Sequence, residues 1–265
     1  MALINKGDVL TISAGHSTKT DPGAVGYRVE SELNKLVTLA FVELCKKHNI
    51  IIYDVTPYDS DLSVVDRLAY EVNKANSYKS KLHICVHHNS SNGQAYGTEV
   101  YVYENSGFAA QCANAVVKAI SNLGFKNRGV KENKQLYVIR ETNMPCILTE
   151  IAFVDNINDM DLWKRLGEKN IAKAMFKALT GIEDEEKSGF LKNVVVYGND
   201  IDKRAAEYLA DYLKCPIVHI SNFKNIQSER VYAIGGGLDI KDSIKIAGKD
   251  RYETIKAVLK YMDKL

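Results

Sequence analysis

Three strand-like runs of the sequence lead into side chains that could bind a metal ion or transfer a proton. The segment KLHICVHHNSSNG places His87 and His88 where an apolar run gives way to a polar loop. A second apolar run leads into His16, and a third leads into Glu150. Because ligands bind at the carboxyl ends of the strands in parallel α/β sheets, we expect these three strand ends to meet at one edge of a sheet.

The residue types are those of a catalytic zinc site, which commonly takes three His, Glu or Asp ligands and leaves a fourth position for water. His16 is one candidate ligand, and spacing alone allows either His87 or His88 as another. Glu30 continues the apolar stripe of the helix that follows it, so it should point toward the sheet. Glu32 is rotated by roughly 100° or more from that stripe and should face solvent. We therefore expect Glu30 to be the third ligand.

Glu150 lies in the apolar run ILTEIAF, where desolvation would raise its pKa and suit it to act as a general base. An alternative is a strand-end carboxylate paired with Arg128 or Arg140. A single histidine at a strand end is more often structural, and Glu30 could simply be a helix-start carboxylate stabilised by the helix dipole. The convergence of all these residues on one sheet edge favours a metal-dependent hydrolase.

Composition excludes several other classes of protein. The five cysteines are odd in number and lie mostly in apolar runs, which favours reduced, buried thiols over disulfides or a cysteine nucleophile. A formal charge of +2 over 265 residues argues against a nucleic-acid partner. No run approaches the roughly 18 apolar residues of a membrane span, so no membrane insertion is expected. The first residues lack the pattern of a signal peptide, which predicts a protein made in the cytoplasm that acts outside only after release.

Strand and helix patterns alternate through residues 1–181, which predicts an α/β domain with a largely parallel sheet flanked by helices on both faces. The helix expected at 62–76 has Leu62, Val65, Leu68, Ala69 and Val72 on one side. The remaining elements are strands at 9–13, 50–55, 81–87, 98–103, 136–139 and 146–149, helices around 33–47, 108–123 and 157–179, the last bent near Gly167, and a loop at 124–134.

A second, smaller α/β domain is expected at 190–265. The acidic, apolar-poor segment 182–189 is bounded by glycine and predicts a linker. Beyond it we expect strands at 194–197, 217–220 and 231–234, and helices at 203–213 and 252–262. A unit of this size is small but adequate for an α/β domain, especially if it associates with a second copy of itself.

The first 181 residues resemble zinc-dependent N-acetylmuramoyl-L-alanine amidases of the amidase-3 type. The matching segments occur in the family's order: AGHS, ESELN, CVHHNSSNG, NRGVK and LYVIRETNMPCILTEIAFVDN. Cys85 and Ala152 depart from it, since they stand where the family often has serine and glycine. The resemblance implies one catalytic Zn²⁺ held by His16, Glu30 and His87, with Glu150 as the catalytic glutamate. It leaves His88, Asn89 and Arg128 as candidates for substrate contact or for support of the ligands.

The segments VVVYGND, VYAIGGG and IAGKDRYETIKAVLKYM of the second domain are similar to a unit of the cell-wall-binding repeat type 2. An amidase followed by such a module resembles phage endolysins. These hydrolyse the amide between N-acetylmuramic acid and L-alanine in peptidoglycan to lyse the host, while the module binds a wall polymer of a Gram-positive host. Three alternatives remain: a bacterial autolysin or spore-wall amidase, a zinc peptidase that cuts the stem peptide, and a non-enzymatic wall-binding structural protein.

Overall fold

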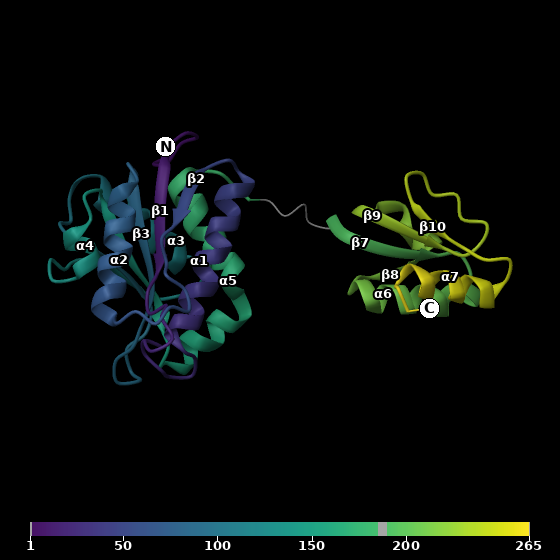
Figure 1. Ribbon diagram of the computed structural model, residues 1–265, viewed down its shortest axis with the longest axis horizontal. Helices are drawn as coiled ribbons and strands as arrows, with labels where there is room; N and C mark the ends of the chain where they lie inside the picture. The colour runs from purple at the N-terminus through teal and green to yellow at the C-terminus, as the bar shows by residue number, and fades with distance from the viewer. Residues whose placement is uncertain (1, 185–189, 265) are drawn as a thin grey trace. The chain divides into compact units, whose positions relative to one another are not determined.

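The computed structural model describes residues 2–184 and 190–264, and the chain forms two compact units, Met1–Asp184 and Glu185–Leu265 (Figure 1). Of the expected linker, residues 185–189 lie outside the described residues. Residues 182–184 pack on the first unit, because Ile182 lies against its core and Asp184 Oδ1 is 2.7 Å from Lys47 Nζ. No helix in the described ranges has the length and apolar character to span a membrane.

Within residues 2–184, the chain builds a six-stranded sheet in the order β2-β1-β3-β6-β4-β5. Strands β1, β2, β3 and β6 pair in parallel, whereas β4 is antiparallel to β6 and parallel to β5. The strands are β1 (Val9–Ala14), β2 (Ile51–Asp54), β3 (Leu82–Asn89), β4 (Thr98–Val102), β5 (Asn127–Glu132) and β6 (Cys146–Phe153). The helices are α1 (Glu30–Lys47), α2 (Val64–Ser77), α3 (Gly107–Ser121), α4 (Tyr137–Glu141) and α5 (Ile157–Thr180).

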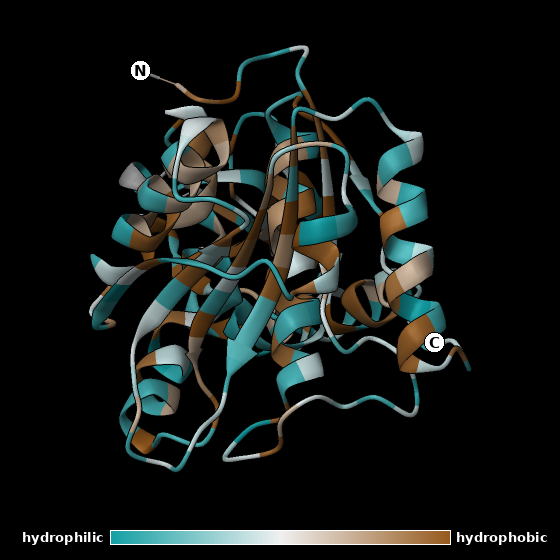
Figure 2. Ribbon diagram, turned by 90° about the vertical axis from the view of Figure 1, so that its left-hand side faces the viewer, coloured by the Kyte–Doolittle hydropathy of each residue, from teal (hydrophilic) through white to brown (hydrophobic). Residues whose placement is uncertain are grey.

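Helices cover both faces of this sheet, which confirms the predicted α/β class. The main core joins α1, α3 and α5 to one face, and a smaller cluster joins α2 and α4 to the other (Figure 1). Hydrophobic colour accordingly concentrates on the strands and the helix sides that face them (Figure 2). Helix α5 bends at Gly167, whose φ of 71° is non-helical, as expected.

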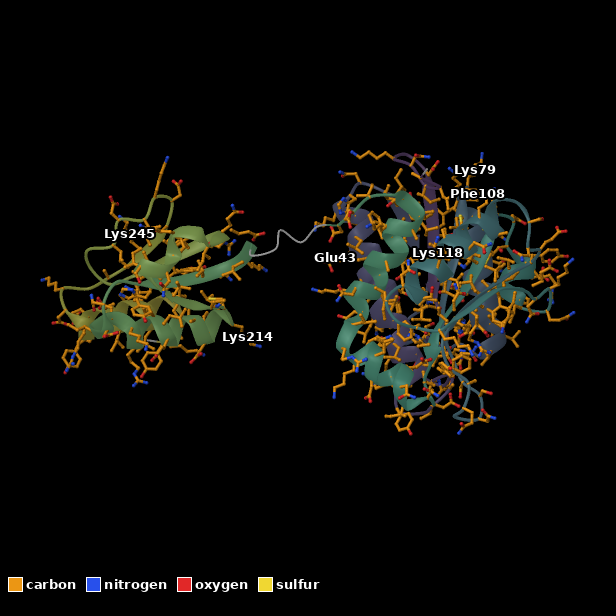
Figure 3. The ribbon with its side chains drawn as sticks, turned by 180° about the vertical axis from the view of Figure 1, so that it is seen from behind. Glu43, Lys79, Phe108, Lys118, Lys214 and Lys245 are labelled. Atoms are coloured by element: carbon orange, nitrogen blue, oxygen red, sulfur yellow. The ribbon has the colours of Figure 1, made fainter. Side chains whose placement is uncertain are left out.

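The candidate ligands His16 and His87 lie near the carboxyl ends of β1 and β3. Lys79 and Phe108 mark the opposite end of the unit, where β3 begins (Figure 3). His16 follows β1 by two residues, and His87 is the sixth of the eight residues of β3. The expectation that Glu150 ends its strand is wrong, because β6 continues to Phe153 through its pairing with β3.

Three local predictions for the first unit are also wrong. The segment 136–139 enters the short helix α4, whose Val138 and Ile139 cover the sheet, so β-branched residues here serve packing rather than a strand. The segment 124–134 contains β5, whose polar sequence suits an edge strand that pairs only with β4.

The third wrong prediction concerns the buried side of α2. Val65 is 74% exposed, whereas Arg67 and Glu71 are buried beside Val72. Two charged side chains can occupy this face because Arg67 Nη1 lies 2.9 Å from Glu71 Oε1, so each charge has a partner. Helix α2 begins as capping rules predict, with Ser63 Oγ accepting a hydrogen bond from the Asp66 amide.

The second unit has a parallel four-stranded sheet in the order β10-β9-β7-β8 within residues 190–264. Its core lies between this sheet and the helices α6 and α7, around residues such as Val195, Leu209 and Tyr232. The expected smaller α/β unit is present, while β10 and a 3₁₀ helix were not predicted. The elements are β7 (Phe190–Tyr197), α6 (Asp200–Leu213), β8 (Ile217–His219), a 3₁₀ helix (Ile220–Asn225), β9 (Gln227–Ile234), β10 (Ile244–Ile246) and α7 (Arg251–Tyr261).

Candidate active site

His16, Glu30 and His87 converge as a three-residue cluster at the sheet edge. One potential ligand atom from each residue lies within 4.8 Å of the other two. His87 Nδ1 is 2.9 Å from Glu30 Oε1, and His16 Nε2 is 3.6 Å from Glu30 Oε2. Glu32 is exposed, as the helical periodicity predicted, whereas Glu30 is only 4% exposed. Two nitrogens and a carboxylate at this spacing are a donor set suited to a divalent metal ion.

Backbone shape creates the space that the cluster occupies. A Cβ atom on Gly15 would lie 2.1 Å from the His87 ring, so only glycine allows the ring to approach this backbone. His16 itself has a left-handed φ of 55°, a conformation that costs energy for a residue with a Cβ. This turn carries the chain out of β1 and directs the imidazole toward Glu30.

The ring of His16 is oriented by Asp21, which sequence reasoning did not identify. His16 Nδ1 lies 2.8 Å from Asp21 Oδ1, so Nδ1 donates and Nε2 is left free to bind a metal ion. Burial raises the pKa of Asp21, but the hydrogen bond and charge of His16 and the charge of Arg67 outweigh burial and lower it. Arg67 Nε is 3.4 Å from Asp21 Oδ2, which extends this network to the buried Arg67–Glu71 pair.

Glu30 is held in its ionised form. Burial would raise its pKa, but the hydrogen bond from His87 and the charges of His87 and His16 lower it to about 2. The Ala24 amide donates a further hydrogen bond of 3.0 Å to Oε2. A carboxylate fixed by these donors is already deprotonated and placed, as a metal ligand must be.

His88 lies on the other face of β3 from His87 and is 1% exposed. The Trp163 indole donates to His88 Nε2 over 3.0 Å, so the imidazole proton is on Nδ1 and is donated to Asn34 Oδ1 over 2.8 Å. The Asn34 amide in turn donates to Gly15 O at 3.0 Å and faces Glu30 Oε1 at 3.4 Å. The His88 amide also donates to Glu30 Oε1 over 3.3 Å, so His88 supports Glu30 through its backbone and, by its side chain, through Asn34.

Glu150 is paired in register with His87 on the neighbouring strand, so the two side chains share one face of the sheet. Its Oε2 atom is buried, and no hydrogen-bond partner for it exists among the described residues. Burial raises the pKa of Glu150 to about 7, with the charges of Glu30 and Glu99 adding to this rise and that of His87 opposing it. A carboxyl group with a pKa near neutrality, beside residues that could hold a metal ion, is suited to proton transfer.

The expected alternative partners of Glu150 are engaged elsewhere. Arg140 pairs with Glu141, and Arg128 Nε donates to Glu99 Oε2 over 2.6 Å. Asn89 Nδ2 also donates to Glu99, over 3.0 Å. Glu99 was not identified from the sequence, although its position in the alternating run Thr98–Val102 put it on one face with Tyr101.

The sequence of this chain is similar to those of known proteins. The family described as N-acetylmuramoyl-L-alanine amidase matches residues 10–181. An uncharacterized protein of Clostridium perfringens is 32% identical over 201 residues, covering 69% of this chain and 58% of the relative. The endolysin of Bacillus phage SPP1 is 28% identical over 212 residues, covering 71% and 76%. The chain thus spans little more than half the length of the first relative.

A solved structure gives the same architecture. The catalytic domain of the CD27L endolysin, described as targeting Clostridia difficile, superposes with a TM-score of 0.62 at 28% sequence identity. The match covers 67% of this chain and 99% of that domain.

Proposed function

The chain belongs to the N-acetylmuramoyl-L-alanine amidase family Amidase_3, and on this basis we propose that its first unit hydrolyses the amide between N-acetylmuramic acid and L-alanine in peptidoglycan. The observation that carries the proposal is the meeting of His16, Glu30 and His87 beside Glu150, whose buried Oε2 has no hydrogen-bond partner among the described residues. Hydrolysis of an unactivated amide needs an electrophilic centre and a proton carrier, and this arrangement can supply both.

The proposed cofactor is a single Zn²⁺ ion held by His16, Glu30 and His87. The residues fit such an ion: Asp21 fixes the His16 tautomer, and the Glu30 carboxylate is ionised with a pKa of about 2, chiefly because the His87 hydrogen bond and charge outweigh burial. A zinc ion bound there would polarise the scissile carbonyl and lower the pKa of a water molecule. Two histidines and one glutamate also match the ligand types of known catalytic zinc sites.

Glu150 carries the proton in this mechanism. It accepts a proton from the attacking water molecule and delivers it to the departing nitrogen of alanine. Because burial raises its pKa to about 7, both uptake and release of the proton are accessible near neutral pH. The register of β3 and β6 holds this carboxyl group beside His87 while water attacks.

We further propose that the second unit, residues 190–265, binds a cell-wall polymer of a Gram-positive host and that the whole chain acts on the wall after release from the cytoplasm. Support comes from the similarity of its sequence to cell-wall-binding repeat type 2 and from the phage endolysin among the relatives. Host-cell lysis by a phage is the proposed setting. Association of two chains through this unit is part of the same proposal.

Digestion of purified peptidoglycan tests the activity. We expect the full chain to expose new amino groups that belong to L-alanine, while the glycan strands stay intact and gain no reducing ends. Labelling of the new amino termini followed by mass analysis of the fragments identifies the cleaved bond. New amino termini on a residue within the stem peptide would replace the amidase assignment with a peptidase.

A further inference from the structure

A row of charged side chains crosses four neighbouring strands on the α2 and α4 face of the first unit. Backbone register pairs His87 of β3 with Glu150 of β6, and pairs Glu150 with Glu99 of β4. Paired residues project to the same face of a sheet, so these three side chains lie in one line. Arg128 and Lys131 of β5 extend the line, since both contact Glu99 Oε2.

Glu99, Arg128 and Lys131, here called the edge cluster, contain one anion and two cations. Glu99 is only 2% exposed and also accepts hydrogen bonds from Tyr101 Oη at 2.8 Å and Asn89 Nδ2 at 3.0 Å. In the part of the chain that the structure describes, neither Arg128 nor Lys131 pairs with any other carboxylate. The edge cluster therefore has a net charge of +1.

Both cations are fixed in place and still reach the surface. The Arg128 guanidinium stacks 4.9 Å from the centroid of the Phe153 ring, and its Nη1 donates to Tyr96 O over 3.4 Å. Its side chain is 26% exposed and that of Lys131 is 38% exposed. The Arg128 Nη2 atom has no hydrogen-bond acceptor among residues 2–184 and 190–264. The edge cluster can thus bind an external anion without giving up its contacts with Glu99.

The free carboxylates of the substrate all lie on one side of the bond to be cleaved. The carboxyl group of muramic acid is the acyl part of that amide, so only the peptide side retains free carboxylates. Strand β5 lies two strands away from β6, which carries Glu150. With a spacing of about 4.8 Å between neighbouring strands, the distance across the sheet from Glu150 to β5 is about 10 Å. An extended peptide advances about 3.3 Å per residue, so this distance corresponds to the second or third residue after the cleaved amide.

We propose that Arg128 and Lys131 form a subsite that binds a free carboxylate on the second or third residue of the stem peptide. This inference rests on the proposed function, because it takes Glu150 as the position of the cleaved amide. Arginine matches the planar geometry of a carboxylate, and lysine adds a point charge. Glu99 is the positioning residue that holds both cations at the peptide side of the site.

Two N-acetylmuramoyl tripeptides test the subsite. One has free carboxylates on its second and third residues, and the other has carboxamides at the same positions. We expect the wild-type chain to show a kcat/KM about tenfold higher for the carboxylate substrate, mainly through a lower KM. A factor of about ten corresponds to the free energy of one charge-assisted hydrogen bond. In the Arg128→Gln, Lys131→Gln double variant, this ratio should fall to about one.

Lys134→Gln is the matched control, since Lys134 is an exposed lysine beyond β5 that stacks on Tyr103 and lies outside the edge cluster. It should keep the tenfold ratio. A wild-type chain that treats both substrates alike, or a double variant that keeps the ratio, overturns the proposal. If the double variant does not fold, Lys131→Gln replaces it, because this variant retains the Arg128–Glu99 pair. Its ratio should fall below that of the wild type, and an unchanged ratio contradicts the subsite.

Binding of the two free tripeptides to the full chain, measured by calorimetry, separates the subsite from the proposed function. Tighter binding of the carboxylate tripeptide to the wild type than to the double variant supports the subsite even if neither muramoyl substrate is hydrolysed. Equal binding of the carboxylate and carboxamide tripeptides contradicts it.

Discussion

Replacement of Glu150 by glutamine is expected to lower the release of L-alanine amino groups from peptidoglycan by about 10²–10⁴-fold while the chain still binds one zinc ion. Glutamine has nearly the same shape but cannot accept the proton of the attacking water molecule. The proposed zinc ligands are His16, Glu30 and His87, which this substitution leaves unchanged. Initial rates of amine release and elemental analysis of the same preparation measure both quantities.

Glu141→Gln provides the control for this substitution. Glu141 is an exposed carboxylate that pairs with Arg140, away from the metal cluster, and its replacement should leave both activity and zinc content at the wild-type level. Near-normal amine release by the Glu150→Gln variant would remove Glu150 from the mechanism. Loss of zinc together with activity would instead make Glu150 a determinant of metal binding.

The second large effect separates the two adjacent histidines. His87→Ala should abolish zinc binding, because it removes one of the three proposed ligands and leaves a two-residue site. His88→Ala should still bind one zinc ion per chain, with affinity lower by about tenfold, since the His88 side chain acts on Glu30 through Asn34 and the variant keeps the His88 amide that donates to Glu30 Oε1. It should also unfold at a lower temperature, because the buried Trp163 indole loses its acceptor, a cost of about 1–3 kcal/mol.

Zinc content by elemental analysis and thermal unfolding followed by circular dichroism distinguish the two variants. The opposite pattern, in which His87→Ala keeps its zinc and His88→Ala loses it, would assign the ligand role to His88. Loss of zinc from both variants without unfolding would mean that the support of Glu30 by Asn34 is as important for zinc binding as a direct ligand is.

Local periodicity was sufficient to place Glu30. Helix geometry repeats every three to four residues, so the apolar stripe of α1 fixed which of Glu30 and Glu32 faces the sheet, and the exposures agree. The same reasoning failed for α2, whose buried face includes Arg67 and Glu71. Hydropathy cannot anticipate a buried ion pair, because the partners compensate for each other only once the helix is packed.

The histidine pair shows where spacing stops being informative. Successive strand residues point to opposite faces, so His87 and His88 had to diverge. Which of them meets Glu30 depends on where the loop after β1 and the start of α1 lie, and this is a tertiary property. The family resemblance chose His87, and the structure places its Nδ1 2.9 Å from Glu30 Oε1.

Sequence reasoning missed residues whose partners are distant in the chain and residues in loops, where hydrophobic periodicity gives no signal. Glu99 gains its place from an antiparallel register with Glu150, about fifty positions later. Asp21 lies in a loop, where no periodicity predicts its contact with His16. Asn34 was accessible in principle, because it follows Glu30 by four residues and therefore shares its helix face.

Zinc titration of the chelated full chain, with release of L-alanine amino groups from purified peptidoglycan as the signal, tests the central claim most directly. We expect no release from the metal-free chain, a rise in proportion to added zinc, and saturation at one equivalent per chain. Release that continues after chelation, or new amino groups that do not belong to L-alanine, would contradict a zinc-dependent amidase built on His16, Glu30, His87 and Glu150.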